Sequence, residues 1–185
     1  ASFDNLPEGV EYTFEVTYLL EEYTSDPYTV PTGTSGSTSI IIDVADTYVT
    51  VVFDGSGVAG RSISVYDHDG TFLSEVPTET TDTDGEAMFS LPTGRFYIYK
   101  TTYLNYEHAS LPSEGNTLLV ISHGTVHVQA YNGVDPFQGT VTLYSIGSYV
   151  PTGFTIASDV DGKASFACPA YRTYVVGVDI DGTTY

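Results

Sequence analysis

Apolar and polar residues alternate with a period of two along most of the chain, which is the pattern of half-buried β-strands. Glycine, proline, asparagine and aspartate stand between the alternating runs, and these residues favour turns. Short strands at such close spacing are typical of an all-β sandwich or barrel. The runs that we expect to form strands are 11–18, 48–53, 62–66, 86–91, 95–103, 117–122, 125–131, 140–144, 163–167 and 173–180.

The composition also favours strands over helices. The 185 residues include 16 tyrosines and 9 phenylalanines but no tryptophan, and aromatic side chains suit the pleated surface of a sheet. The strongest helical candidate is 17–26, which contains Leu and Glu but has no N-cap signal and lies at the end of an alternating run. We therefore expect little helix.

An internal repeat is the strongest signal in the sequence. The stretch 48–66 aligns without gaps on 126–144, a shift of 78 residues, and Asp84-Gly85 then meets Asp161-Gly162 with a shift of 77. A partial third copy opens the chain. In that copy, 6–25 matches 91–110, and "STSIIIDV" at 37–44 takes the place of "NTLLVISH" at 116–123.

The repeated segments resemble a known group of modules. A strand and a glycine-containing turn, "DGSGVAGRSISVYD", precede "TDTDGEAMFSLPTGRFYIY", an order similar to the carboxypeptidase regulatory-like, transthyretin-like and Cna B-type modules. The resemblance covers 46–122 and 123–185, although "CPAYRTY" replaces "LPTGRFY" in the second copy and loses the glycine. It implies seven-stranded prealbumin-like sandwiches, which serve as stalks, spacers and adhesive subunits.

Cna B-type modules often carry an isopeptide crosslink that begins at a lysine of the first strand. The two lysines of this chain are Lys100, in the strand after "LPTG", and Lys163, after an Asp-Gly turn. Neither lies in a first strand, so we predict no such crosslink.

The fold class that follows is all-β, with tandem Ig-like (prealbumin-like) β-sandwich domains and an N-terminal partial unit. We expect 1–45 to hold only the last strands of a unit, 46–122 to form one sandwich, and 123–185 to form a sandwich that lacks its final strand. Residues 1–45 are candidate donor strands for the C-terminal sandwich of a neighbouring copy, because open sheet edges tend to be paired or covered. Pairing within the same chain and a piece of a longer array are the alternatives.

The charge balance narrows the class of partner. The formal net charge is −19, from 24 acidic and 5 basic residues, which argues against nucleic acid and anionic membranes as partners. No apolar run is long enough to span a membrane. The beginning "ASFDN" is compatible with a mature exported protein. We expect an extracellular or cell-surface location, with the protein secreted.

Four Asp-x-Asp-Gly sequences are the candidate metal sites. Aspartate and glycine in this order form tight turns, and this structural interpretation competes with Ca²⁺ binding, because Ca²⁺ takes six to eight oxygen ligands on flexible loops. A solvated, salt-adapted acidic surface is the third interpretation. The predicted ligands are Asp67, Asp69, Asp82, Asp84, Asp159, Asp161, Asp179 and Asp181.

Enzyme motifs are missing from the sequence. His123 and His127 are four residues apart, but on a strand that spacing separates them along the sheet, so we interpret them as solvated. Cys168 takes the repeat position of Leu91 and is interpreted as a buried apolar residue. We predict no catalytic residue and no cofactor apart from the candidate Ca²⁺.

The leading hypothesis is a structural subunit of an extracellular or cell-surface assembly, whether a filament, sheath, surface layer or adhesin stalk. Its partners would be copies of itself, joined head to tail by β-strand addition. The alternative is a carbohydrate- or protein-binding adhesive module on a surface stalk, with exposed tyrosines contacting surface glycans.

Overall fold

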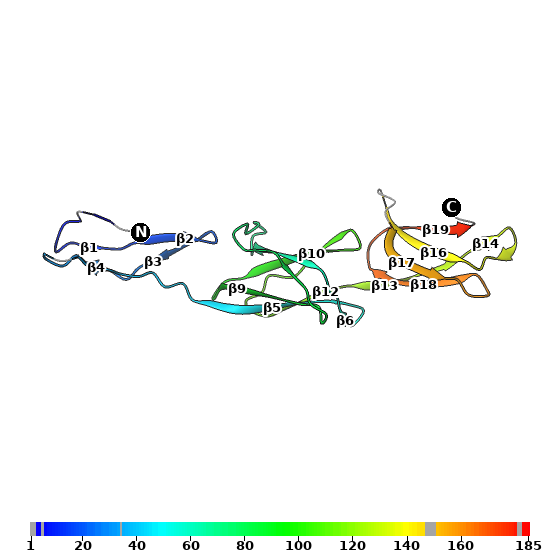
Figure 1. The fold of residues 1–185 in the computed structure, drawn as a ribbon, viewed down its shortest axis with the longest axis horizontal. Helices are drawn as coiled ribbons and strands as arrows, with labels where there is room; N and C mark the ends of the chain where they lie inside the picture. The colour runs from blue at the N-terminus through cyan, green and yellow to red at the C-terminus, as the bar shows by residue number, and fades with distance from the viewer. Residues whose placement is uncertain (1–2, 5, 34, 147–150, 181–182) are drawn as a thin grey trace.

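The computed structural model describes residues 3–4, 6–33, 35–146, 151–180 and 183–185. Within them the chain is all-β, with 20 strands and no helix. The strands form three groups that follow one another along the long axis (Figure 1). We call these groups the N-terminal segment (6–43), the central sandwich (44–121) and the C-terminal sandwich (123–185). No helix that could cross a membrane occurs in the described residues.

The N-terminal segment contains two small strand pairs. Its strands are β1 (Glu11–Tyr12), β2 (Glu15–Tyr18), β3 (Glu21–Thr24) and β4 (Tyr28–Thr29). β1 pairs with β4, and β2 with β3, both antiparallel. The helical candidate 17–26 is therefore a hairpin, because its residues continue the period-two pattern on both sides of a tight turn. Residues 37–42 lie outside any strand, and Ile41 is 77% exposed.

The central sandwich has two sheets around one core. Its strands are β5 (Val44–Phe53), β6 (Ser56–Gly57), β7 (Ser62–Asp67), β8 (Glu79–Thr80), β9 (Glu86–Pro92), β10 (Tyr97–Tyr103), β11 (Tyr106–Ala109) and β12 (Thr117–Ile121). One sheet has the order β11-β10-β7-β8. In the other, β5 pairs antiparallel with β9 and parallel with β12. The inward side chains of these strands are buried, which is the expected result of period-two alternation.

The C-terminal sandwich repeats this plan, but in the described part of the chain no strand takes the place of β12. Its strands are β13 (His123–Gln129), β14 (Tyr131–Asn132), β15 (Asp135–Pro136), β16 (Thr140–Ser145), β17 (Pro151–Ala157), β18 (Lys163–Pro169), β19 (Tyr174–Ile180) and β20 (Thr183–Thr184). β13 pairs with β18, and the other sheet has the order β17-β16-β19-β20. The small core contains Val141, Leu143, Phe166 and the buried Cys168.

The strand registers correct the gap-free repeat alignment. Val49 lies opposite Ala87 in the central sandwich, and Val128 lies opposite Ala164 in the C-terminal one. Ala87 and Ala164 are equivalent positions of the repeat and lie 77 residues apart. Their strand partners Val49 and Val128 lie 79 residues apart, so β5 corresponds to β13 with a shift of 79 residues and not 78. The gap-free alignment matched the buried Val49 with the exposed His127. A slip of one residue turns every side chain to the opposite face, so burial decides the register.

Candidate functional site

The β2–β3 hairpin joins the N-terminal segment to the central sandwich. Its turn residues Leu19 and Leu20 have φ angles of 48° and 68°, the positive values of a tight hairpin turn that matches the twist of the two strands. Leu19 is 3% exposed and belongs to the core of the central sandwich. Arg95 Nη1 donates a hydrogen bond of 2.8 Å to the Leu19 carbonyl oxygen. We call this contact joint one.

Arg95 is the centre of joint one. Its Nη2 lies 3.1 Å from Asp67 Oδ1 and 3.8 Å from Glu21 Oε1. The Arg95 and Asp67 side chains are 10% and 9% exposed, so the pair is largely shielded from water. The guanidinium also lies 5.5 Å from the ring centre of Tyr97. The buried pair thus fixes the position of the hairpin turn, since either charge left alone would be costly.

The β10–β11 hairpin makes the corresponding contact with the C-terminal sandwich. Its turn residues Leu104 and Asn105 also have positive φ angles, 51° and 65°. Arg172 Nη2 donates a 3.0 Å hydrogen bond to the Glu107 carbonyl oxygen, and its guanidinium lies 4.9 Å from the ring centre of Tyr106. The Tyr106 hydroxyl donates in return to the Thr173 carbonyl oxygen at 2.8 Å. We call this contact joint two.

The two joints use corresponding arginines and hairpins, but Arg95 binds the turn carbonyl of Leu19 and Arg172 binds the carbonyl of Glu107, three residues after Leu104. Arg95 and Arg172 correspond in the repeat, as do the turns Leu19-Leu20 and Leu104-Asn105. The joints differ in charge, because the position of Asp67 is taken by Ser145, whose Oγ lies 3.4 Å from Asn105 Nδ2. The correspondence of the two arginines was visible in the repeat, but their role at a joint depends on distant contacts that the sequence does not show.

The chain continues directly from the central to the C-terminal sandwich beside joint two. Here His123 Nε2 lies 3.0 Å from Asp54 Oδ1, with both side chains about half exposed. The Phe53 and Phe154 rings, one from each sandwich, have centroids 6.4 Å apart. The two sandwiches are therefore joined both by the connection from β12 to β13 and by the hairpin.

An open strand edge is the second candidate feature. In the central sandwich, β5 is covered by β9 on one edge and by β12 on the other. Its counterpart β13 pairs with β18, and no strand of the described chain covers its other edge. Such an edge presents backbone donors and acceptors that can pair with another strand.

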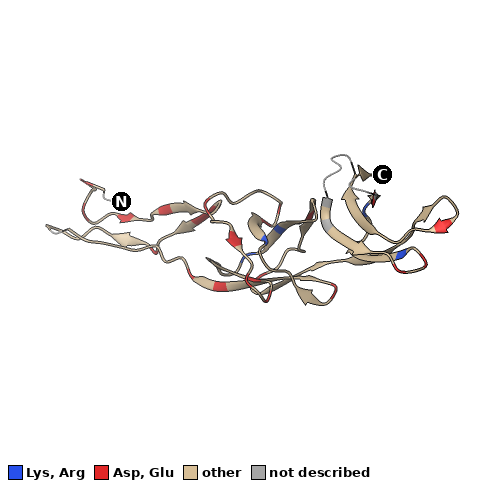
Figure 2. Cartoon of the chain, turned by 45° about the vertical axis from the view of Figure 1, so that its right-hand side comes forward, with Lys and Arg blue, Asp and Glu red and all other residues tan. Residues whose placement is uncertain are grey.

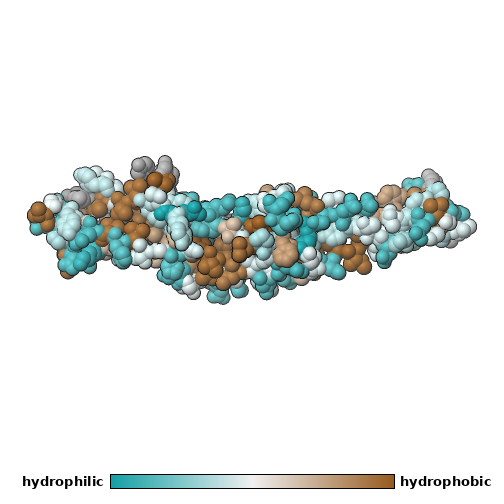
Figure 3. Space-filling view, turned by 180° about the vertical axis from the view of Figure 1, so that it is seen from behind, coloured by the Kyte–Doolittle hydropathy of each residue, from teal (hydrophilic) through white to brown (hydrophobic). Residues whose placement is uncertain are grey.

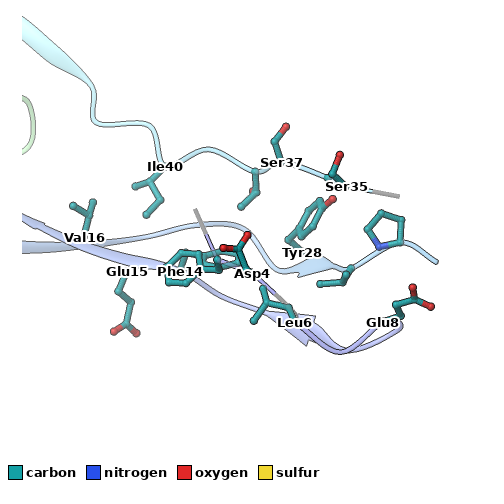
Figure 4. Close-up of a pocket in the computed structure, with 15 residues that line it drawn as sticks. Asp4, Leu6, Glu8, Phe14, Glu15, Val16, Tyr28, Ser35, Ser37 and Ile40 are labelled. Carbon is teal, nitrogen blue, oxygen red and sulfur yellow. The ribbon is translucent and has the colours of Figure 1, made fainter. Parts of the chain in front are cut away.

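A groove in the N-terminal segment is the third candidate feature. Its volume is about 790 Å³, and Phe14, Tyr28 and Ile40 contribute to its lining together with Asp4 and Glu8 (Figure 4). In the repeat, Phe14 and Ile40 correspond to Tyr99 and Leu119, which are buried core residues of the central sandwich. The groove is thus the open counterpart of a sandwich core.

Gly36 allows the groove to narrow at Tyr28. A Cβ atom at Gly36 would collide with the Tyr28 hydroxyl. A side chain at this position would therefore move the end of the flexible Tyr28 side chain aside.

Apolar side chains also cover part of the outer surface (Figure 3). In the sheet that contains β9, β5 and β12, the outward residues Met88, Tyr48, Leu118 and Val120 are 49%, 42%, 59% and 59% exposed. Tyr48 and Met88 are direct cross-strand partners. Contiguous exposed apolar surface of this kind is characteristic of contact regions.

The predicted metal ligands are distributed over separate turns, and acidic residues occur in all three groups (Figure 2). Asp82 Oδ1 accepts hydrogen bonds from the backbone of Asp84 and Glu86, both at 2.9 Å. Asp159 Oδ1 accepts equivalent bonds from Asp161 and Lys163, at 2.9 and 2.8 Å. These contacts are those of tight aspartate turns.

The remaining predicted ligands have other surroundings. Asp67 is paired with Arg95, and hydrogen bonds from Thr71 lower the pKa of Asp69. Asp179 accepts a bond from Thr184 at 3.3 Å, and Asp181 lies outside the described residues. Nowhere in the described ranges do three His, Cys, Asp or Glu side chains converge as a metal site would require. Those of the predicted ligands that the structure describes do not converge on one metal site, and Ca²⁺ binding stays a prediction.

Comparisons with known proteins provide no family assignment, since no protein-family model and no curated protein match the chain. The TIE protein of Bacillus anthracis is similar with 20% identity and a TM-score of 0.35, over 96% of this chain and 35% of that one. This chain therefore spans well under half the length of that protein.

Two further solved structures are similar over most of their own length. A DUF3823 family protein from Parabacteroides merdae has 13% identity and a TM-score of 0.36, over 75% of this chain and 92% of that one. A proposed carbohydrate-binding protein from Bacteroides uniformis has 11% identity and a TM-score of 0.30, over 74% of this chain and 90% of that one. Because these TM-scores are low, we argue function from this chain's own residues.

Proposed function

We propose that this chain is a structural subunit of an extracellular or cell-surface assembly, such as a filament, sheath, surface layer or adhesin stalk. The repeated use of a hairpin and an arginine carries this proposal: the turn of the β2–β3 hairpin meets Arg95 of the next group at Leu19, and strand β11 of the β10–β11 hairpin meets Arg172 at Glu107. Both contacts run from a hairpin of one group to an arginine of the next group along the chain, and successive groups lie along one axis (Figure 1). This is the geometry that an extended scaffold needs.

The open edge of β13 is the proposed site of strand addition between copies. Residues 38–42 correspond in sequence to β12, and residues 37–43 lie outside any strand. If this segment pairs with β13 as β12 pairs with β5, Thr38 lies opposite Val128 and Ile40 opposite Ala130. Ile40 and Ile42 then point into the C-terminal core, and Ile41 points outward. The proposed partner is another copy, added head to tail.

Cations are the proposed counter-ions of this assembly. Chains with a net charge of −19 repel one another, so close packing requires salt or divalent ions such as Ca²⁺ to screen the charge. Addition of Ca²⁺ is expected to lengthen the polymers, and a chelator is expected to shorten them. Polymers of equal length with Ca²⁺ and with chelator would contradict the role of Ca²⁺ but would not contradict strand addition.

Electron microscopy and light scattering of the purified chain test the assembly. Wild type is expected to form linear polymers, and Ile40→Lys is expected to block them because it places a charge in an apolar core. Ile41→Lys is the matched control, since Ile41 points outward and its replacement leaves pairing intact. Monomeric wild-type protein in both Ca²⁺ and chelator would overturn strand addition between copies. Equal assembly of Ile40→Lys and Ile41→Lys would also overturn strand addition between copies.

The groove favours a second function, that of an adhesive binding module. Phe14 and Tyr28 offer aromatic faces, and Asp4 and Glu8 offer hydrogen-bond acceptors, which together are the groups that bind a sugar ring. A glycan array tests this function, with Tyr28→Ala as the variant expected to lose binding. Binding that survives Tyr28→Ala would place the sugar site elsewhere.

A further inference from the structure

The two joints differ at one titratable position. Tyr23 of the β2–β3 hairpin corresponds to His108 of the β10–β11 hairpin in the repeat. His108 follows Glu107 on β11, whose carbonyl oxygen accepts the hydrogen bond from Arg172, and the charge of Arg172 acts on His108. Joint two therefore contains a group that can gain a proton in mild acid, where joint one contains a tyrosine.

The surroundings of His108 are unfavourable to a second positive charge. Its Nε2 is buried and has no hydrogen-bond partner within the described chain. The Tyr103 backbone offers one hydrogen bond. On its own strand, the neighbouring Glu107 carboxylate lies 3.2 Å from Lys100 Nζ of β10. The charge that faces His108 from the C-terminal sandwich is Arg172.

The matching position in joint one is richer in negative charge. There Arg95 has two carboxylates within 4 Å, those of Asp67 and Glu21. In joint two, Ser145 takes the place of Asp67, and Arg172 binds a backbone carbonyl and a tyrosine ring. A protonated imidazole in joint two would thus add to the positive charge of the arginine without a facing carboxylate to offset it.

We propose that joint two is an acid-sensitive hinge, in which protonation of His108 releases the β10–β11 hairpin from Arg172. At neutral pH the neutral imidazole leaves the hairpin docked, and the two sandwiches keep one relative orientation. In acid the hairpin detaches, and the sandwiches stay linked by the connection from β12 to β13 and by the His123–Asp54 and Phe53–Phe154 contacts beside it. This hinge goes beyond the structural role and does not depend on polymerisation.

The direction of the pH effect follows from the burial of His108. Burial, and then the charge of Arg172, lower the pKa of His108 below its usual value of 6.5, against a smaller opposing effect of the Tyr103 backbone. The released hairpin exposes the imidazole and binds the proton more readily than the docked one. Docking is therefore unaffected well above pH 6.5 and weakens as the pH falls below it.

A second histidine at the same boundary acts in the opposite sense. His123 lies beside Asp54, so its protonation adds an ion pair between the two sandwiches. Both side chains are about half exposed, and exposed pairs contribute little. We therefore expect protonation of His108 to outweigh protonation of His123. A variant that replaces His123 separates the two effects.

Residual dipolar couplings from NMR test the hinge, because they report whether two parts of a molecule share one orientation. The couplings of the central and C-terminal sandwiches are expected to fit one common alignment at pH 7.5, and to require two alignments at pH 5. His108→Tyr, which copies joint one, is expected to keep one alignment at both values. His123→Gln is expected to respond to acid as wild type does, or more strongly.

Two results would overturn the hinge. One is a single alignment for the wild type at both pH values. The other is an acid response in His108→Tyr equal to that of the wild type. The imidazole resonance of His108 also reports its protonation directly. The pKa of His108 is expected to lie below its usual value of 6.5, and a midpoint at or above 6.5 would also contradict the proposal.

Discussion

Arg95 and Arg172 occupy the same position in successive repeats, and each donates a hydrogen bond to a backbone carbonyl of the preceding hairpin, at 2.8 and 3.0 Å. The two side chains differ in burial, because Arg95 is 10% exposed and ion-paired while Arg172 lies on the surface. One motif therefore produces a strong and a weak version of the same contact.

This difference predicts unequal effects of arginine replacement. Arg95→Ala is expected to destabilise the central sandwich by about 3 to 5 kcal/mol, because Asp67 is left buried without its partner. Arg172→Ala is expected to cost about 1 kcal/mol or less, since exposed polar contacts contribute little. Urea unfolding of both variants measures the difference. Equal losses would contradict the assignment of a buried pair to joint one alone.

The turn residue Leu19 is predicted to hold the N-terminal segment in place. Leu19→Ala is expected to cost about 2 to 4 kcal/mol through the lost burial, and to release the hairpin while the central sandwich stays folded. Limited proteolysis should then cleave within residues 25–43 faster than in wild type. Leu20→Ala is the control, because Leu20 is 59% exposed, and it should be cleaved at the wild-type rate.

The Asp-x-Asp-Gly turns are predicted to differ in their need for glycine. Gly85 has φ +82°, and an added Cβ would lie 2.6 Å from Val58 N and 2.7 Å from Val51 O. Gly70 has φ +89° but open space around the Cβ position. Gly85→Ala should therefore lower the melting temperature clearly more than Gly70→Ala. Similar melting temperatures for the two variants would show that the backbone contacts at Gly85 can relax.

High pH is predicted to unfold the central sandwich through its buried tyrosines. Burial raises the pKa of Tyr97 to about 12 from its usual value of 10.0, and burial also raises the pKa of Tyr99. The folded state keeps these hydroxyls protonated while the unfolded state releases the protons, so stability is full below pH 10 and decreases as the pH rises towards 12. Absorbance at alkaline pH measures the ionisation of the tyrosines, and circular dichroism measures the unfolding. Ionisation of every tyrosine near pH 10 without unfolding would contradict the buried positions.

The sequence predicted the strands well because period-two alternation and turn residues are local properties. Every alternating run that we identified contains a strand in the structure. The hairpin at residues 17–26 was harder to predict, because its turn uses two leucines at positive φ in place of glycine or asparagine. Strand β17, at Pro151–Ala157, was not among the expected runs.

The candidate site was less predictable than the strands. Joints one and two depend on residues 76 and 65 positions apart in the chain, Leu19 with Arg95 and Glu107 with Arg172. No local pattern encodes such contacts. The spacing of the acidic turns suggests cation ligands, yet the first aspartate of two of these turns, Asp82 and Asp159, accepts backbone hydrogen bonds within its own turn. That the C-terminal sandwich lacks its final strand follows from comparing the repeats with each other, and it stays a prediction.

The parallel pairing of β12 with β5 also determines how the central sandwich responds to stretching. The chain enters through the start of β5 and leaves through the end of β12, and the two strands run side by side from Thr117–Val49 to Ile121–Phe53. A pulling force on the flanking groups slides these strands past each other, so the hydrogen bonds between them must break together and not one at a time. This strand pair makes the central sandwich a mechanically resistant link between its neighbours.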